Sequence, residues 1–132
     1  MPKKRIFISY DYTNDKKYKN LLLAWDQNND FDFGFYDMSV DVSVDSNNAA
    51  AIKRAISAKI SDSTYFLCLV GKQTSKSKWI TWEINKAVEL KKNIVAVKIE
   101  KENDNPLSLY GVSATWALSF NFDAIKKAVE EA

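Results

Sequence analysis

The sequence predicts a single-domain α/β protein over residues 1–132, with a parallel sheet of about five strands between two layers of helices. Two observations predict this three-layer architecture. Short, nearly continuous apolar segments alternate along the chain with longer segments whose apolar residues recur at helical spacing. The chain is also 46% hydrophobic at a length of 132 residues, which suffices for one hydrophobic core and leaves no room for a second domain.

Five short segments are the strand candidates. Residues 5–9, 65–70 and 94–99 (RIFIS, YFLCLV and IVAVKI) are almost wholly apolar, as expected for strands covered on both faces. Residues 31–36 (FDFGFY) alternate between apolar and other residues, which indicates a position nearer the sheet edge. Residues 117–120 (ALSF) form the fifth and shortest candidate.

Helices are predicted at residues 16–26, 48–60 and 75–92, and again at 122–131, where Asn121 is the expected N-cap. Strands and helices therefore alternate through most of the chain. This order predicts parallel strand pairing, because a parallel connection needs a crossover that a helix can supply.

Residues 100–116 lack a clear helical pattern where another crossover helix is expected, so this segment is either a short, poorly patterned helix or a functional loop. In folds of this kind, ligands bind beyond the carboxyl ends of the strands. The segments SYDYTND, DMSVD and GKQTSKSKW, which follow the first three strands, are therefore expected to form the rim of the site.

Composition excludes several classes of function. The chain has no histidine and a single cysteine, Cys68, so it holds no Cys/His zinc site and no Ser-His-Asp triad, and no metal site is predicted. Its three glycines stand alone, which excludes a glycine-rich phosphate loop. The net charge of +2 does not favour nucleic acid as a partner. No apolar run is long enough for a signal peptide or a membrane span, and a reducing cytoplasmic location is expected.

Glu83 occupies an unexpected position in the predicted helix 75–92. On a helical wheel it falls within the arc that also contains Trp79, Ile80 and Ile84, although the helix has a polar side. One interpretation is that Glu83 complements the positive end of the helix dipole. The other is that a partly desolvated carboxylate faces a cleft and binds sugar hydroxyls or stabilises positive charge.

The residues that follow the third strand carry a resemblance to a known family. The opening RIFISY, the segment LVGKQTSKSKW and above all WITWE, residues 79–83, resemble a TIR domain, whose motif is Trp-x-x-x-Glu. The run from Cys68 to Ile99 is more similar to the TIR-like branch that includes the TIR protein of the Thoeris anti-phage system. The resemblance covers residues 5–99 and extends weakly beyond, and it implies a flavodoxin-like fold.

Enzymatic members of that family cleave the nicotinamide–ribose bond of NAD, and the resemblance implies that Glu83 is the catalytic residue. NAD would be the substrate, and no cofactor is implied. Nicotinamide leaves a cationic pyridinium as a neutral base, so a carboxylate that offsets an oxocarbenium-like transition state is the main requirement. Water as acceptor gives ADP-ribose, whereas a group of the same molecule gives a cyclic isomer.

Eight further residues are candidate substrate-binding groups at the strand ends and in the helix that bears Glu83. Phe7 is equally consistent with the core, whereas Tyr10 has a ring that can stack on a base. The loop residues are also consistent with solvated turns, Trp79 with a packing role, and Trp82 with a contact to another subunit or to the long loop. The eight are Phe7, Ser9, Tyr10, Asp37, Ser39, Lys78, Trp79 and Trp82.

Charge distribution predicts a partner. Residues 26–45 contain six aspartates and no basic residue, whereas Lys72, Lys76 and Lys78 cluster in the loop before Trp79. These are either two solvated loops or the two faces of a head-to-tail homo-oligomer, as in related TIR assemblies. A separate effector protein, reached through the nucleotide signal, is the other expected partner.

The alternative function is a TIR-like module that signals by binding and has no turnover. A phosphoacceptor receiver shares the five-stranded architecture, but the third strand ends in LVGK without an aspartate. A flavodoxin is excluded because SYDYTND has no glycine for a phosphate loop.

Overall fold

The computed structural model describes residues 4–27, 33–36 and 49–132, and its five described strands form one parallel sheet in the order β2-β1-β3-β4-β5. The predicted α/β fold class is thereby confirmed. The strands are β1 (Lys4–Ser9), β2 (Phe33–Tyr36), β3 (Tyr65–Val70), β4 (Asn93–Lys98) and β5 (Thr115–Ala117).

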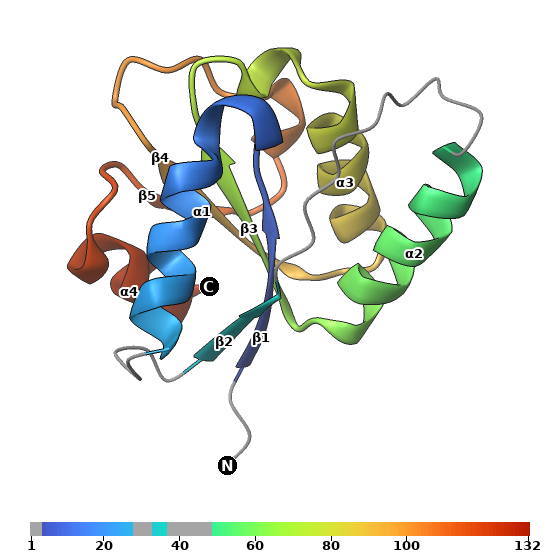
Figure 1. Ribbon diagram of the computed structural model, residues 1–132, viewed down its shortest axis with the longest axis horizontal. Coiled ribbons are helices and arrows are strands. Elements are labelled where there is room, and N and C mark those ends of the chain that lie inside the picture. Colours follow the sequence, from blue (N-terminus) through green and yellow to red (C-terminus); the bar gives the residue numbers. More distant parts are fainter. Residues whose placement is uncertain (1–3, 28–32, 37–48) are drawn as a thin grey trace.

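Four helices cover the two faces of this sheet (Figure 1). One face carries α1 (Tyr12–Gln27) and α4 (Phe122–Glu131), and the other carries α2 (Ala49–Asp62) and α3 (Lys78–Glu89). Two short 3₁₀ turns, η1 (Thr74–Lys76) and η2 (Leu107–Leu109), lie in the connections. The order of the strands places β1 and β3 at the centre, so their carboxyl ends lie at the middle of the rim.

Alternation along β1 divides the core into two halves. Ile6 and Ile8 pack on the α1 and α4 side with Leu22 and Ile125, whereas Phe7 packs on the α2 and α3 side. All six residues of β3 are buried, as its continuous apolar sequence predicts. The two clusters pack against opposite faces of the sheet.

The structure corrects several sequence predictions. Helix α1 starts at Tyr12 instead of residue 16, because Asp11 caps it by accepting hydrogen bonds from the amides of Thr13 (3.1 Å) and Asn14 (3.4 Å). The fifth strand is Thr115–Ala117 instead of residues 117–120, because Phe120 packs against Tyr18 and Trp25 beside the sheet.

Residues 100–114 form a loop with the 3₁₀ turn η2 and no α-helix, and β5 begins at Thr115. Whether the loop has a function stays a prediction. The predicted N-cap Asn121 is confirmed, because its side chain accepts a hydrogen bond from the amide of Ala124 (2.8 Å). Helix α2 follows its predicted position closely. Helix α3 is shorter than the predicted range 75–92, because Ser77 caps its start and the turn η1 precedes it.

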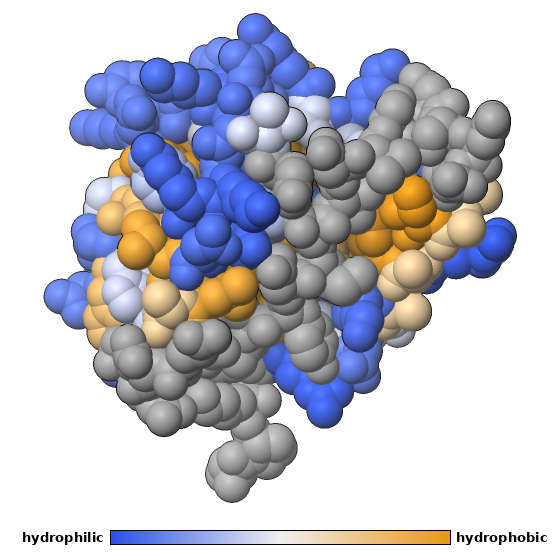
Figure 2. Space-filling view, viewed as in Figure 1, coloured by the Kyte–Doolittle hydropathy of each residue, from blue (hydrophilic) through white to orange (hydrophobic). Residues whose placement is uncertain are grey.

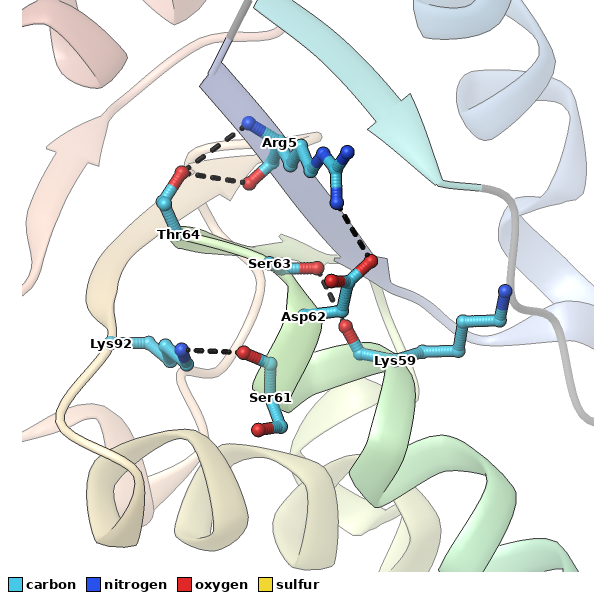
Figure 3. A network of polar contacts seen from close by, with 7 residues as sticks. All are labelled: Arg5, Lys59, Ser61, Asp62, Ser63, Thr64 and Lys92. Carbon is cyan, nitrogen blue, oxygen red and sulfur yellow. Dashed lines mark hydrogen bonds and ion pairs between the residues drawn. The ribbon is translucent and has the colours of Figure 1, made fainter.

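Polar contacts join the elements at the amino ends of the strands (Figure 3). The Arg5 guanidinium pairs with Asp62 at 2.9 Å, and Thr64 exchanges hydrogen bonds with the backbone of Arg5. Lys92 donates to the carbonyl of Ser61 at 2.9 Å, which ties the end of α3 to the end of α2. These contacts fix the edge of the sheet that is opposite the predicted site.

Among the described helices, none combines the length and apolar character needed to cross a bilayer.

Candidate functional site

Helix α3 positions the carboxylate of Glu83 through a well-defined start. Ser77 is its N-cap, and the Ser77 hydroxyl accepts a hydrogen bond from the amide of Ile80 at 3.2 Å. The preceding turn is fixed by the buried Thr74, whose hydroxyl donates to the carbonyl of Leu69 (3.1 Å) and accepts from the amide of Gly71 (2.8 Å). The register of α3 against β3 is thereby set from its first turn.

Glu83 points from α3 into the interior at the end of β1. Its side chain is 5% exposed, and the Ser9 hydroxyl donates a 2.7 Å hydrogen bond to Glu83 Oε1. Ser9 is the last residue of β1 and pairs in register with Cys68 of β3. The pair therefore stands at the carboxyl edge of the two central strands, where the sequence predicted a site.

Burial controls the ionisation of Glu83. Loss of solvation raises the pKa of the Glu83 carboxyl from 4.5 to about 8, against a smaller lowering effect of the Ser9 hydrogen bond. Burial also raises the pKa of the Cys68 thiol, and the negative charges of Glu83 and Asp15 raise it further. Glu83 is thus a desolvated carboxyl in low-dielectric surroundings, poised to titrate near neutral pH.

The structure argues against the interpretation of Glu83 as a partner of the helix dipole. The residue lies in the second turn of α3, beyond the reach of the dipole at the helix start, and no acidic residue occupies the first turn. The predicted apolar arc is confirmed by the buried Ile80, Ile84 and Ala87. Val88, which falls at the margin of this arc on the helical wheel, is 39% exposed.

Phe7 and Tyr10 do not join Glu83 on an open surface. Phe7 is fully buried and stacks on Phe66 with ring centroids 5.7 Å apart, so its ring offers no surface to a ligand in this conformation. Tyr10 is 7% exposed and packs in the core on the α1 side, across the sheet from Glu83. Phe7 and Tyr10 lie on opposite sides of the sheet because successive residues of an extended chain point to opposite faces.

Trp79 and Trp82 lie on the outer side of α3. Their rings meet edge to face with centroids 6.0 Å apart. Trp82 is half-buried, and the ammonium of Lys53 in α2 lies 5.6 Å from its ring centroid. The exposed Lys78 and Trp82 line a separate cavity of about 350 Å³. Asp37 and Ser39 lie outside the described residues.

Sequence reasoning missed one buried acid at the same rim. Asp15, in the first turn of α1, is 5% exposed, and burial together with the nearby Asp11 raises the pKa of its carboxyl from 3.8 to about 6. Its carboxylate lies directly against Gly71, and Asp15 Oδ2 has no hydrogen-bond partner. No sequence motif marks this contact, which depends on how α1 crosses the end of β3.

The sequence matches the family model described as Thoeris protein ThsB, TIR-like domain, over residues 7–104, about three quarters of the chain. The chain belongs to this TIR-like family. The matched residues include Ser9 and Glu83, and they extend beyond β4 into the loop. No curated protein matches the chain in sequence.

Among solved structures, this TIR-like chain resembles that of the Clostridium botulinum CMP N-glycosidase BcmB. The TM-score is 0.63 at 12% sequence identity, over 97% of this chain and 98% of that one. At this identity, the likeness shows that the two proteins share a fold.

The described residues define what the site can do. They bring no three cysteine or acidic side chains close enough together to hold a metal ion. They do provide one carboxyl that is buried, oriented by a hydroxyl and tuned to titrate near neutral pH. Such a group can accept hydrogen bonds from substrate hydroxyls, stabilise a developing cation or deliver a proton.

Proposed function

We propose that this TIR-like protein cleaves the N-glycosidic bond between nicotinamide and ribose in NAD, with Glu83 as the catalytic residue. The observation that carries the proposal is the buried Glu83 carboxyl, bonded to Ser9 at the carboxyl edge of the central strands. Its family membership supports the same assignment, because Glu83 is the glutamate of the Trp-x-x-x-Glu motif.

In the proposed reaction, the nicotinamide–ribose bond breaks and its electron pair leaves with nicotinamide, which becomes neutral. The ribose carbon acquires oxocarbenium character, and the Glu83 carboxylate offsets this charge while accepting hydrogen bonds from the ribose hydroxyls. Water then adds to that carbon and loses a proton, which gives ADP-ribose. Addition of a group from the same molecule gives a cyclic isomer.

The raised pKa of Glu83 couples substrate charge to catalysis. With a pKa of about 8, the carboxyl is mainly neutral at pH 7 in the free protein. A bound pyridinium cation favours the carboxylate and lowers this pKa, so binding of NAD releases a proton. As the bond breaks, the positive charge moves from the pyridinium to the ribose carbon, and Glu83 accelerates this step to the extent that it interacts more strongly with the ribose cation than with the pyridinium.

The biological role is part of the same proposal. The product is a nucleotide signal that acts in anti-phage defence in the cytoplasm and reaches a separate effector protein. The family description, which names the Thoeris system, supports this role.

The test is chromatography of NAD incubated with concentrated protein, with nicotinamide and each ADP-ribose isomer measured. We expect the wild type to release nicotinamide, and Glu83→Gln to be slower by about 100-fold or more. Glu89→Gln is the matched control, because Glu89 lies on the same helix but is exposed and pairs with Lys86 at 2.9 Å. Equal rates for wild type and Glu83→Gln would overturn the assignment.

A second candidate is the cleavage of a nucleoside monophosphate, and one observation favours it. Because Glu83 is mainly protonated at neutral pH, it can donate a proton to a leaving nucleobase, which a neutral N-glycoside needs. The shared fold with a CMP N-glycosidase makes CMP the first such substrate to test. Release of cytosine but no nicotinamide would select this candidate, whereas release of neither by the folded protein would favour the non-catalytic binding module.

A further inference from the structure

A second cavity opens at the same rim on the α1 side of the sheet. It has a volume of about 250 Å³ and lies between the first turns of α1, the loop after β3 and the loop after β4. Figure 2 shows hydrophilic residues over this part of the surface, where α1 begins. Neither Ser9 nor Glu83 lines it, and none of its lining residues lies on α3. It is therefore distinct from the proposed catalytic pair.

The wall of this cavity contains a carboxylate in an incomplete environment. Asp15 is 5% exposed, and Asp15 Oδ2 is buried without a hydrogen-bond partner. A buried carboxylate oxygen that lacks a partner destabilises the folded protein, and a ligand that donates a hydrogen bond to this oxygen would remove the penalty. The nearby Asp11 increases the penalty by like-charge repulsion, whereas Lys17 reduces it.

The surrounding backbone is built to hold this arrangement. A β-carbon at Gly71 would overlap the Asp15 carboxylate, so only glycine permits the close approach. Thr74 fixes the Gly71 amide, and Asn103 donates a 3.1 Å hydrogen bond to the carbonyl of Val70. The buried Lys98 binds the carbonyl of Asn103, which secures the loop after β4 against the end of β3. The cavity is thus framed by fixed contacts from three elements.

Charge and size restrict the ligand. Asp15 requires a hydrogen-bond donor. At the rim, the exposed Lys17 and Lys72 outnumber the exposed Glu100, which also lines the cavity, and the two ammonium groups favour an anion. The small volume and the amides of Asn14, Gln73 and Asn103 favour a small polar molecule. Because Lys17 already offsets the charge of Asp15, neutral hydroxyls fit beside this carboxylate better than a second ammonium.

From this juxtaposition we propose that the cavity is a binding site for a sugar phosphate, separate from the Glu83 site. Vicinal hydroxyls of the sugar donate to the Asp15 carboxylate, and the phosphate lies against Lys17 and Lys72. The ligand is the ribose phosphate of a nucleotide or the free sugar phosphate, which have the same recognition chemistry. This inference depends on residues that the proposed NAD cleavage does not use, and it can fail or succeed independently.

The test is an NMR titration of the full chain with ribose 5-phosphate, which has no N-glycosidic bond to cleave. We expect saturable shifts at the Gly71 and Asn103 amides. Asp15→Asn, which keeps the size of the side chain, should weaken binding by about tenfold or more, and Lys72→Ala by about three- to tenfold. Asp123→Asn and Lys127→Ala are matched controls, because both residues are exposed on α4 and neither lines the cavity.

Three further ligands show how much the sugar and the phosphate each contribute to binding, and whether the sugar phosphate belongs to a nucleotide. Ribose and inorganic phosphate should each bind more weakly than ribose 5-phosphate, and tighter binding of ADP-ribose would identify the nucleotide as the source. The proposal would be overturned if neither ribose 5-phosphate nor ADP-ribose causes saturable shifts. An affinity for ribose 5-phosphate that is unchanged in Asp15→Asn would also overturn it. Tighter binding of serine than of ribose 5-phosphate would overturn it as well, because the site would then prefer an ammonium group to sugar hydroxyls. If a variant is unfolded, the response of the Gly71 and Asn103 amides in the wild type decides the question.

Discussion

At the scale of single residues, the molecule retains two carboxyls that are poorly suited to a stable interior. Glu83 has one hydrogen bond to compensate its burial, and Asp15 has an oxygen with none. Both groups have raised pKa values because burial disfavours the charged form. Both also lie at the carboxyl edge of the sheet, where folds of this class bind ligands. Buried carboxyls with few hydrogen bonds, located where ligands bind, are expected in sites whose function lowers the stability of the protein.

The first prediction concerns the pH dependence of stability. Because the pKa of Glu83 is higher in the folded protein than its ordinary value of 4.5, the folded state holds a proton that the unfolded state loses. The free energy of unfolding should therefore fall as pH rises from about 4.5 to 8. Between pH 6 and 8, the expected loss from Glu83 is roughly 2 kcal/mol, and Asp15, whose pKa is about 6, adds a much smaller loss.

Urea unfolding of wild type and Glu83→Gln at pH 6, 7 and 8 measures this loss. The variant should show almost no slope in this window, and it should be the more stable protein at pH 8 because its side chain is neutral throughout. Parallel pH profiles for the two proteins would show that Glu83 titrates elsewhere.

The second prediction concerns the contact between Gly71 and Asp15. Gly71→Ala places a methyl group where the carboxylate lies, and we expect it to destabilise the protein by about 1 to 3 kcal/mol. In the double variant Asp15→Ala/Gly71→Ala, the space is vacated and much of this stability should return. Thermal unfolding of both single variants and the double variant provides the cycle, and additive effects would contradict the contact.

At the scale of elements, helix α3 connects the stability of its start to the position of Glu83. The third prediction compares two caps. Ser77→Ala and Asn121→Ala each remove a side-chain acceptor from a helix start, and each should cost about 1 kcal/mol of unfolding free energy. Only Ser77→Ala should also lower the rate of nicotinamide release, because Glu83 lies on its helix.

Equal loss of stability with unequal loss of activity is the expected result of this comparison, measured by thermal unfolding and by chromatography. If both variants release nicotinamide at the wild-type rate, the first turn of α3 does not control the placement of Glu83.

Sequence patterns predicted some elements well because their burial is simple. The strand β3 is buried on both faces and follows its predicted range, as an uninterrupted apolar run should. The strand β5 was misplaced because Phe120 is aromatic, yet it packs against α1 side chains after the strand has ended. A short edge strand carries too little periodicity to distinguish these two cases.

The candidate site was predictable only in part. The position of Glu83 on the apolar side of its helix is a local pattern, so the sequence revealed its burial. Its partner Ser9 is 74 residues away, and the pairing depends on the register of β1 with β3. The contact of Asp15 with Gly71 joins the first turn of α1 to the loop after β3, which meet only in the folded chain, and no local pattern encodes it.

At the scale of the whole molecule, the amino ends and the carboxyl ends of the strands differ in the groups that they hold. The amino edge is joined by the contacts of Arg5, Asp62, Thr64 and Lys92, which tie β1, α2 and α3 together. The carboxyl edge holds the buried acids and the cavities. Substitutions at the amino ends are therefore expected to change stability alone, whereas substitutions at the carboxyl ends change binding or turnover as well.

The fourth prediction is salt-dependent association of whole molecules. The acidic segment 26–45 lies mostly outside the described residues, while Lys72, Lys76 and Lys78 are exposed beside η1. If acidic and basic segments of successive copies meet, sedimentation at low salt should show oligomers that dissociate as salt is raised. Lys76→Glu should abolish them, and a monomer under all conditions, with NAD present, would contradict this assembly.

The position of Cys68 gives the protein a chemical reporter of its own. Cys68 is the single thiol in the chain, it is fully buried, and it pairs in register with Ser9 beneath Glu83. A thiol-specific reagent can therefore label the protein only when β1 and β3 separate near this pair or when the whole chain unfolds. The labelling rate of the wild-type protein therefore measures how often β1 and β3 separate near this pair. A slower rate after addition of a nucleotide would indicate that the nucleotide is bound.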